Sequence, residues 1–288
     1  MSDPFDEHRR LLFAVAYDML GSVADAEDVV QDAWLRWSAH DRSDVTEPKA
    51  YLVKIVTRLS YDRYRTEKVR RETYVGPWLP EPMLSGGDVV EDVAEDVEQA
   101  EEVSMAMLVV LETLTPAERA VFVLREVFGF PYAEIATALD RTEASVRQTA
   151  HRARNHVRAR RPRFETDPAE QRRVTERFQA ACFGGDLGAL MELLAPDVVL
   201  VADGGGKAAT ARRPIEGADK VARFVLGLAE KFGRGLQFEF AQISGSPGMI
   251  GRVGDQIEIA GTIEVADGKV AQVLIFRNPD KLAALFTA

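Results

Sequence analysis

The sequence predicts a multidomain protein, with two all-α helical domains followed by an α+β domain in the form of a cone. Apolar residues recur at helical spacing in segments 5–75 and 104–163. From residue 168 onward, segments with helical periodicity are followed by segments that alternate apolar and polar residues, which is typical of strands. The length of 288 residues is enough for two or three domains of about 100–200 residues each.

The composition, with 46% hydrophobic and 28% charged residues, is typical of a soluble globular protein. No stretch approaches the ~20 apolar residues of a membrane span, and the polar N-terminus does not resemble a signal peptide, so we expect a cytoplasmic protein. The single cysteine, Cys182, excludes an intramolecular disulfide and is expected to be a buried structural thiol. The formal net charge of -10 argues against nonspecific coating of nucleic acid, but it leaves room for one basic DNA-binding module.

Segment 5–75 is expected to form a helical bundle. Gly21 is a natural end for the first helix, Asp25 is placed as the N-cap of the second, and Pro48 suits the first turn of the third. The predicted buried stripes are Ala26, Val29, Val30, Ala33, Trp34 and Trp37 in the second helix, and Leu52, Ile55, Val56 and Leu59 in the third.

Segment 76–103 is expected to be a linker. Its "GPWLPEP" holds three prolines and cannot form a regular helix. The run "DVVEDVAEDVEQAEE" follows, with eight acidic residues and no basic one. This run favours a solvated acidic tether, and the alternative is an acidic arm that competes with DNA for basic patches.

Segment 104–163 has the pattern of a helix-turn-helix. Thr115 begins a capping box, a short helix is expected over 131–139, and Thr142 caps the next helix after the turn "DRT". The inner stripe of that last helix is Val146, Ala150, Ala153 and Val157. Its outer face is polar and basic, and we interpret it as a face that reads base edges in the major groove rather than as a solvated face of a bundle. Phosphate contacts are expected from Arg154, Arg158 and the tail that starts at Arg160.

Segment 168–288 begins with helices and continues with strands, which predicts a curved sheet wrapped on helices around an apolar pocket. Asp267-Gly268 is a two-residue hairpin turn. The stretch "DGGGK", 203–207, lacks the spacing of a phosphate loop and favours a flexible turn. The stretch "NPDKL", 278–282, reads as an N-cap followed by a proline-led helix start. No metal-ligand spacing and no nucleophile–base pair stand out, so no catalytic residue, metal or cofactor is expected.

Three stretches together resemble an extracytoplasmic-function sigma factor of the sigma-70 family: "DAEDVVQDAWLRW", "YLVKIVTRLSYDRYR" and "SVRQTAHRAR". The resemblance implies a sigma region 2 domain over 1–75 and a region 4 helix-turn-helix over 104–163. The further stretches "WLPEP", "DGGGK" and "NPDKL" resemble the SigJ-type subgroup, which has a SnoaL-like C-terminal extension of the NTF2-like superfamily. That extension would be the cone over 168–288.

The resemblance implies a set of site residues. The residues that would dock on the β′ clamp helices of the RNA polymerase core are Asp25, Asp28, Gln31, Asp32 and Trp34, although the apolar stripe places Trp34 in the core instead. The residues that would recognise and melt the -10 promoter element are Arg58, Tyr61, Tyr64 and Arg65, which offer stacking surfaces and cationic contacts. The -35 reader would use Ser145, Arg147, Gln148, His151 and Arg152, and the β flap would be a further polymerase partner. Ile55-Val56-Thr57-Arg58 departs from the "IARN" of many members, which leaves the -10 preference open.

In this subgroup the extension is understood as an in-chain regulator. The residues implied in that role are Trp78, Pro80 and Glu81 in the linker, Asp203 and Lys207 in "DGGGK", and Asn278, Asp280 and Lys281 in "NPDKL". An unidentified small molecule in the C-terminal pocket is a further candidate partner. Two alternatives stay open: a ligand-responsive helix-turn-helix regulator, and a SnoaL-like enzyme fused to a DNA-binding module. In such an enzyme Asp203 or Asp255 would be a candidate general base by residue type.

Overall fold

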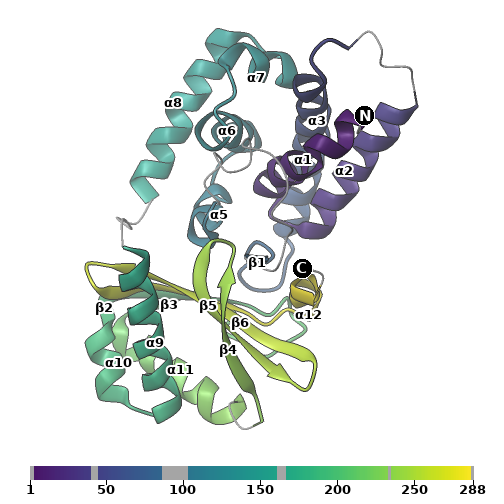
Figure 1. Ribbon diagram of the computed structural model, residues 1–288. Coiled ribbons are helices and arrows are strands. Elements are labelled where there is room, and N and C mark those ends of the chain that lie inside the picture. The colour runs from purple at the N-terminus through teal and green to yellow at the C-terminus, as the bar shows by residue number, and fades with distance from the viewer. Residues whose placement is uncertain (1–2, 40–44, 86–102, 161–166, 233–234, 287–288) are drawn as a thin grey trace. The chain divides into compact units, whose positions relative to one another are not determined.

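The computed structural model describes residues 3–39, 45–85, 103–160, 167–232 and 235–286 (Figure 1). The chain divides into two compact units. Unit 1 is Met1–Thr73, Asp88–Val103 and Met107–Arg161, and unit 2 is Tyr74–Gly87, Ser104–Ala106 and Pro162–Ala288. The whole predicted acidic run, 88–102, and Arg161 and Arg163 of the basic tail lie outside the described residues.

The described part of unit 1 is all-helical, as predicted (Figure 1). Helices α1, α2 and α3 pack on one another, and α8 packs on α6 and α7. The bounds are α1 Pro4–Leu20, α2 Val23–Ser38, α3 Pro48–Arg71, α5 Met105–Leu111, α6 Pro116–Phe122, the π-helical turn η1 Val123–Val127, α7 Tyr132–Leu139 and α8 Glu143–Arg160.

The helix ends follow the predicted capping chemistry with one exception. Gly21 ends α1 in the left-handed conformation at φ 67°, and Thr115 and Glu118 form the reciprocal capping box of α6. The prediction for α2 was wrong: Ser22, not Asp25, is the N-cap, because the Ser22 hydroxyl accepts a hydrogen bond from the Asp25 backbone N–H. The Asp25 carboxylate is therefore free to bind elsewhere.

The predicted stripe of α2 is buried except at Trp34, whose side chain is 43% exposed. A helix turns 100° per residue, so Trp34 lies 100° from Ala33 and falls beside the stripe rather than on it. Trp37 takes the buried position, and its indole Nε1 donates to Asp3 at 3.0 Å. In α3, Ile55 and Leu59 are only half-buried, whereas the other two stripe residues are buried.

Unit 2 holds a seven-stranded sheet in the order β1-β4-β5-β6-β7-β2-β3. The expectation of antiparallel strands is met except between β2 and β7, which are parallel. The bounds are β1 Leu84–Ser85, β2 Leu194–Asp203, β3 Ile215–Glu216, β4 Gln237–Ile243, β5 Ser246–Val253, β6 Gln256–Ala266 and β7 Lys269–Phe276. Because the chain crosses over after β2 and returns through the meander β4–β7, its last strand arrives beside β2 in the same direction.

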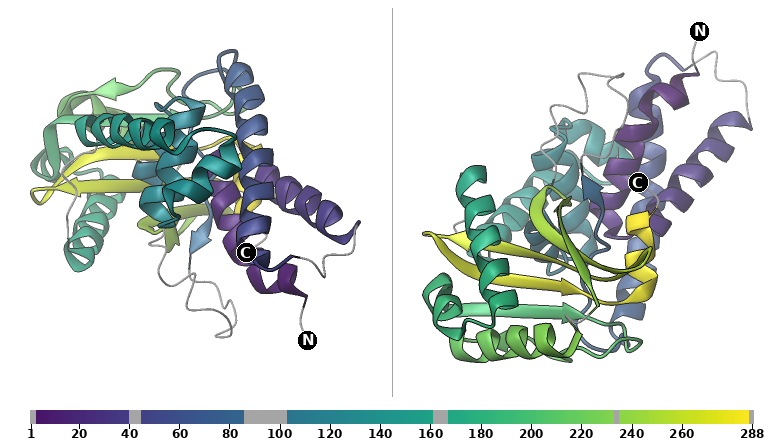
Figure 2. Two further views of the ribbon diagram at one scale, coloured as in Figure 1. Left: turned by 90° about the horizontal axis from the view of Figure 1, so that it is seen from above. Right: turned by 60° about the horizontal axis from the view of Figure 1, so that its bottom comes forward.

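The helices of unit 2 are α9 Pro168–Gly184, α10 Leu187–Leu193, α11 Ala218–Phe232 and α12 Pro279–Leu282, followed by the 3-10 turn η2 Ala283–Phe286. The bent sheet lies over α9, α10 and α11 (Figure 2), and side chains such as Phe178, Val221 and Ile263 form one core between the layers. This α+β arrangement is the predicted curved sheet wrapped on helices. Asp267 and Gly268 both have positive φ, as their hairpin turn requires.

One buried acid in unit 2 was not predicted. The Glu264 side chain on β6 is 6% exposed, and the Ser246 hydroxyl donates to its carboxylate at 3.3 Å. Burial raises the pKa of Glu264 to about 7. The ionised form therefore costs folding free energy at neutral pH.

We expect Glu264→Gln to raise the free energy of unfolding at pH 8 by about 1–3 kcal/mol. In the wild type, the folded state keeps the Glu264 proton between the unfolded pKa near 4.5 and the folded pKa near 7. Stability should therefore fall as pH rises through this window. Denaturant unfolding at several pH values measures the slope, and Glu264→Gln should remove that part of it. An unchanged slope would contradict the assignment.

Candidate functional site

The outer face of α8 presents the predicted -35 residues to solvent. Arg147, Gln148, His151 and Arg152 are exposed, and Ser145 is half-buried. The inner stripe of Val146, Ala150, Ala153 and Val157 is buried, as predicted. The turn before α8 is held by Asp140 at φ 53° and by the Thr142 hydroxyl, which accepts a hydrogen bond from the Ser145 backbone N–H at 3.2 Å.

The basic side chains of α8 form weak contacts that DNA could replace. Arg147 pairs with Glu143 on the same helix and lies 4.6 Å from the Tyr132 ring centre. Arg154 lies 3.4 Å from Glu126. Exposed ion pairs contribute about 0–1 kcal/mol, so their exchange for DNA phosphates costs little.

The exposed side of α2 combines acidic and apolar residues. Asp28, Gln31, Asp32 and Trp34 are exposed, and Leu35 beside them is 50% exposed. Arg63 of α3 holds both Asp25 and Asp28 at 2.7 Å. A mixed surface with an exposed tryptophan is typical of a protein-binding face.

The predicted -10 residues on α3 fall into two groups. Arg58 and Arg65 are exposed, and Tyr61 is half-buried. Tyr64 is 1% exposed, so in this conformation its ring cannot stack on a base. Arg58 lies 3.8 Å from Asp140, and Arg141 donates to the Tyr61 hydroxyl at 3.5 Å.

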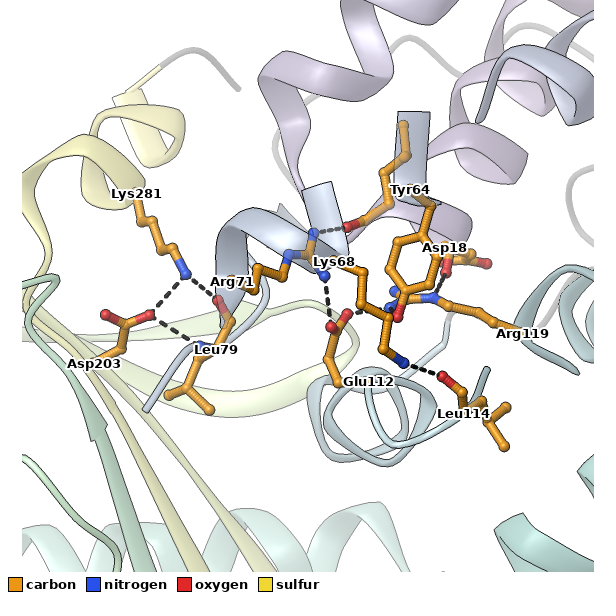
Figure 3. A network of polar contacts seen from close by, with 11 residues as sticks. Asp18, Tyr64, Lys68, Arg71, Leu79, Glu112, Leu114, Arg119, Asp203 and Lys281 are labelled. Atoms are coloured by element: carbon orange, nitrogen blue, oxygen red, sulfur yellow. Dashed lines mark hydrogen bonds and ion pairs between the residues drawn. The ribbon is translucent and has the colours of Figure 1, made fainter. Parts of the chain in front are cut away.

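Tyr64 belongs to a buried polar group, here called the Arg119 network: Arg119, Glu112, Tyr64, Arg71 and Lys68 (Figure 3). The fully buried Arg119 guanidinium pairs with the Glu112 carboxylate, donates to the Tyr64 hydroxyl at 3.2 Å and donates to the Asp18 carbonyl at 3.0 Å. Arg71 donates to the other Glu112 oxygen at 2.5 Å. The network joins α1 and α3 to the helices that follow the linker.

Electrostatics in the Arg119 network favour the ionised pair. Burial alone would raise the pKa of Glu112, but the guanidinium charges of Arg119 and Arg71 outweigh it and hold that pKa below its usual range. Burial lowers the pKa of Lys68, whose ammonium donates to the Leu114 carbonyl at 2.5 Å. Glu112 is therefore a carboxylate between two guanidinium groups.

A second polar group lies within unit 2 and is called here the Asp203 network: Asp203, Lys281, Tyr74, Asn278 and the Leu79 backbone. Figure 3 shows Asp203, Lys281 and Leu79 of this network. Asp203 is fully buried. One of its oxygens accepts from the Tyr74 hydroxyl at 2.6 Å and from the Gly205 N–H at 3.0 Å. The other accepts from the Leu79 N–H at 2.9 Å and from Lys281 at 2.7 Å.

The "NPDKL" residues complete this network. Asn278 caps α12, as predicted, and its amide donates to the Tyr74 hydroxyl at 2.8 Å. Lys281 is 4% exposed, donates to the Leu79 carbonyl and lies 3.9 Å from the Trp78 ring centre. The structure therefore brings together residues from all three predicted stretches.

The other residues implied in the regulatory role lie around the Asp203 network and are not part of it. Lys207 and Asp280 form an exposed ion pair at 2.5 Å. Pro80 is buried and Glu81 is half-buried beside the network residues. The glycines of "DGGGK" permit a close approach: a Cβ on Gly205, whose φ is 58°, would lie 2.5 Å from the Asn278 amide nitrogen.

Neither candidate general base, Asp203 or Asp255, is placed where it could take a proton from a bound substrate. Both oxygens of the Asp203 carboxylate are engaged in the Asp203 network, and Asp255 is exposed in the turn between β5 and β6. Within the described ranges, no group of three or more His, Cys, Asp or Glu residues could hold a metal ion. No described helix is long and apolar enough to cross a membrane.

Sequence reasoning missed Arg119, Glu112 and Tyr74. The sequence analysis assigned them no role, because each has a partner that lies 41 or more residues away. An arginine inside the apolar stretch "PAERAVFVL" was the only local signal that Arg119 is buried.

Comparisons with known proteins agree with this arrangement. The family model "Sigma-70 region 2" matches residues 5–70, and "Sigma-70, region 4" matches residues 104–157. The chain is 43% identical to "ECF RNA polymerase sigma factor SigJ" of Mycobacterium tuberculosis, over 96% of this chain and 91% of that protein. The chain belongs to the extracytoplasmic-function sigma factors.

One further relative and one solved structure support the assignment of this sigma factor. It is 32% identical to "Probable ECF RNA polymerase sigma factor SigI" of the same species, over 96% of this chain and 93% of that protein. The crystal structure of the Mycobacterium tuberculosis SigJ factor covers 97% of this chain and 98% of its own, with a TM-score of 0.79 and 41% identity. The chain described here functions as a promoter-recognising sigma factor. Its family binds core RNA polymerase and promoter DNA.

Proposed function

We propose that the C-terminal domain of this sigma factor regulates promoter activity by holding the linker between regions 2 and 4. The observation that carries the proposal is the Asp203 network. The linker residues Tyr74 and Leu79 bind to Asp203, and Lys281 binds the Leu79 carbonyl. The position of the linker determines how far region 4 can move from region 2.

A regulatory role is favoured over a catalytic one because Asp203 has no oxygen left to act as a base. A general base must reach a substrate proton, whereas all four contacts of Asp203 are to protein groups. These contacts are the ones expected of a structural hold on the linker.

Removal of the residues after 168 tests the regulatory role. The truncation removes Asp203 and Lys281 together, so we expect promoter activity to change more than it does in Asp203→Ala or Asn278→Ala. Run-off transcription with purified core polymerase measures all three. Unchanged transcription after truncation would mean that the C-terminal domain is not a regulator.

We further propose that the exposed side of α2 binds the β′ clamp helices and that Arg58, Tyr61 and Arg65 contact the -10 element. The exposed Trp34 supports the first assignment. Tyr64 would join the -10 contacts only after the Arg119 network opens, since its hydroxyl and ring are now covered.

For the -35 element we propose that Arg147 and Gln148 bond base edges. Arg147→Ala or Gln148→Ala should then cost about 1–3 kcal/mol of promoter affinity and relax the choice of -35 sequence. Binding to promoters with single substitutions in the -35 box measures both effects. Arg223→Ala is a matched control, because Arg223 also pairs with an acid four residues away on an exposed helix. An equal loss on every DNA sequence would mean that these residues touch only phosphate.

A further inference from the structure

Unit 2 contains a cavity of about 90 Å³ between the sheet and helices α9 and α11. Neither network described above includes a side chain of this cavity. Aromatic and aliphatic side chains from both layers line it, among them Phe178, Phe183, Leu228, Phe238, Met249 and Val273.

The side chains that face the cavity include no charged group and no free hydroxyl, because the unpaired Thr262 hydroxyl lies on the other face of the sheet. The Thr175 hydroxyl donates to the Gln171 carbonyl at 2.8 Å. Thr262 pairs across the sheet with Gly248, so its side chain lies on the face opposite to that of Met249, which lines the cavity. Burial raises the pKa of Cys182 to about 12, so its thiol is neutral.

This chemistry selects the class of ligand. A charged or strongly polar molecule would lose its hydration without gaining a partner. Water has no polar group in the lining to bind, and an apolar cavity of about 150 Å³ in another protein stays dry and takes up benzene. At about 90 Å³ the space is smaller than that cavity, so it suits an uncharged, apolar molecule no larger than about one ring.

Phe183 marks the place where the cavity reaches the surface. Its side chain lines the cavity and is 44% exposed. The ring centre of Phe238 lies 4.5 Å from that of Phe183. The exposed Phe183 ring, packed on the half-buried Phe238, gives an apolar ligand a path into the core.

The cavity is continuous with the Asp203 network along one strand. Val273, Leu274 and Ile275 of β7 line the cavity. Directly after β7, the backbone N–H groups of Arg277 and Asn278 donate to the Asp203 carbonyl at 2.7 and 3.0 Å. A shift of β7 on ligand binding would therefore reach the residues that hold the linker.

We propose that this cavity binds an uncharged, apolar small molecule and that occupancy is transmitted along β7 to the Asp203 network. The binding half stands on the cavity alone. The transmission half rests on the proposed regulatory function of that network.

The binding half is tested with toluene and benzoate, which share a ring and differ in charge. Ligand-observed NMR on the full chain should detect toluene and not benzoate. Ala229→Phe fills the cavity and should weaken toluene binding about tenfold or more. Val253→Phe adds the same ring at an exposed site and should leave binding unchanged.

Three results would overturn the binding half: no toluene binding to the wild type, equal binding of benzoate, or full binding to folded Ala229→Phe. If Ala229→Phe does not fold, Phe178→Leu replaces it, because a larger cavity should then admit naphthalene. Exclusion of naphthalene from folded Phe178→Leu would count against the cavity as the site.

The transmission half is tested by hydrogen exchange of the Leu79 amide, which donates to Asp203. Saturation with toluene should change its exchange rate by about threefold or more. An unchanged rate at saturation would overturn transmission. This readout needs no transcription, so its failure is distinct from unchanged transcription after truncation, which would refute the regulatory function itself.

Discussion

Asp203→Ala should lower the free energy of unfolding of unit 2 by about 3–5 kcal/mol, because it leaves the buried Lys281 ammonium without its carboxylate. The same change removes the acceptor of the Tyr74 hydroxyl and of the Leu79 N–H. Asp203→Asn keeps an acceptor but not the charge, so an intermediate loss is expected. Denaturant unfolding of the full chain, followed by a probe in unit 2, measures these differences.

Asp280→Ala is the matched control for that measurement. Its carboxylate also binds a lysine, Lys207, but the side chains of this pair are 63% and 55% exposed. The control should therefore cost no more than about 1 kcal/mol. A loss in Asp203→Ala as small as that of the control would mean that the network does not stabilise the domain.

Glu112→Ala should destabilise unit 1 by about 3–5 kcal/mol, because Arg119 then keeps its charge in a fully buried site without a carboxylate. Removal of both charges in Glu112→Ala with Arg119→Met should recover most of the loss, since an apolar pair needs no counter-charge. Chemical unfolding of the wild type, the two single variants and the double variant gives the coupling energy.

Glu126→Ala is the control for Glu112→Ala. Glu126 also binds an arginine, Arg154, at 3.4 Å, in a pair that is partly exposed. We expect a change within about 1 kcal/mol. Additive losses in the double variant would contradict direct coupling of Glu112 to Arg119.

Local chemistry was enough to predict most elements. Gly21, Thr115, Thr142 and Asn278 terminate or cap helices through contacts within a few residues. Periodicity predicted the buried stripe of α8, and the dipeptide Asp267-Gly268 predicted the hairpin turn. These features depend on spacing along the chain, which a sequence displays directly.

Long-range contacts could not be read in this way. Trp34 lies at the margin of the predicted stripe of α2, and the packing of the helices leaves it exposed while Trp37 is buried. The pairing of Asp25 with Arg63 could not be predicted either, because the two residues are 38 positions apart. Asp203, Asn278 and Lys281 of the Asp203 network came from resemblance, not from spacing. Tyr74 was missed, because it lies 204 residues from Asn278.

Run-off transcription with purified core polymerase tests the central claim most directly, that this chain is a promoter-specific sigma factor. We predict a transcript from a defined promoter only when the full chain is added to core, and a smaller yield from the same promoter with Arg147→Ala. Core that makes no promoter-specific transcript with the folded chain, while a known sigma factor restores initiation in the same assay, would contradict the claim.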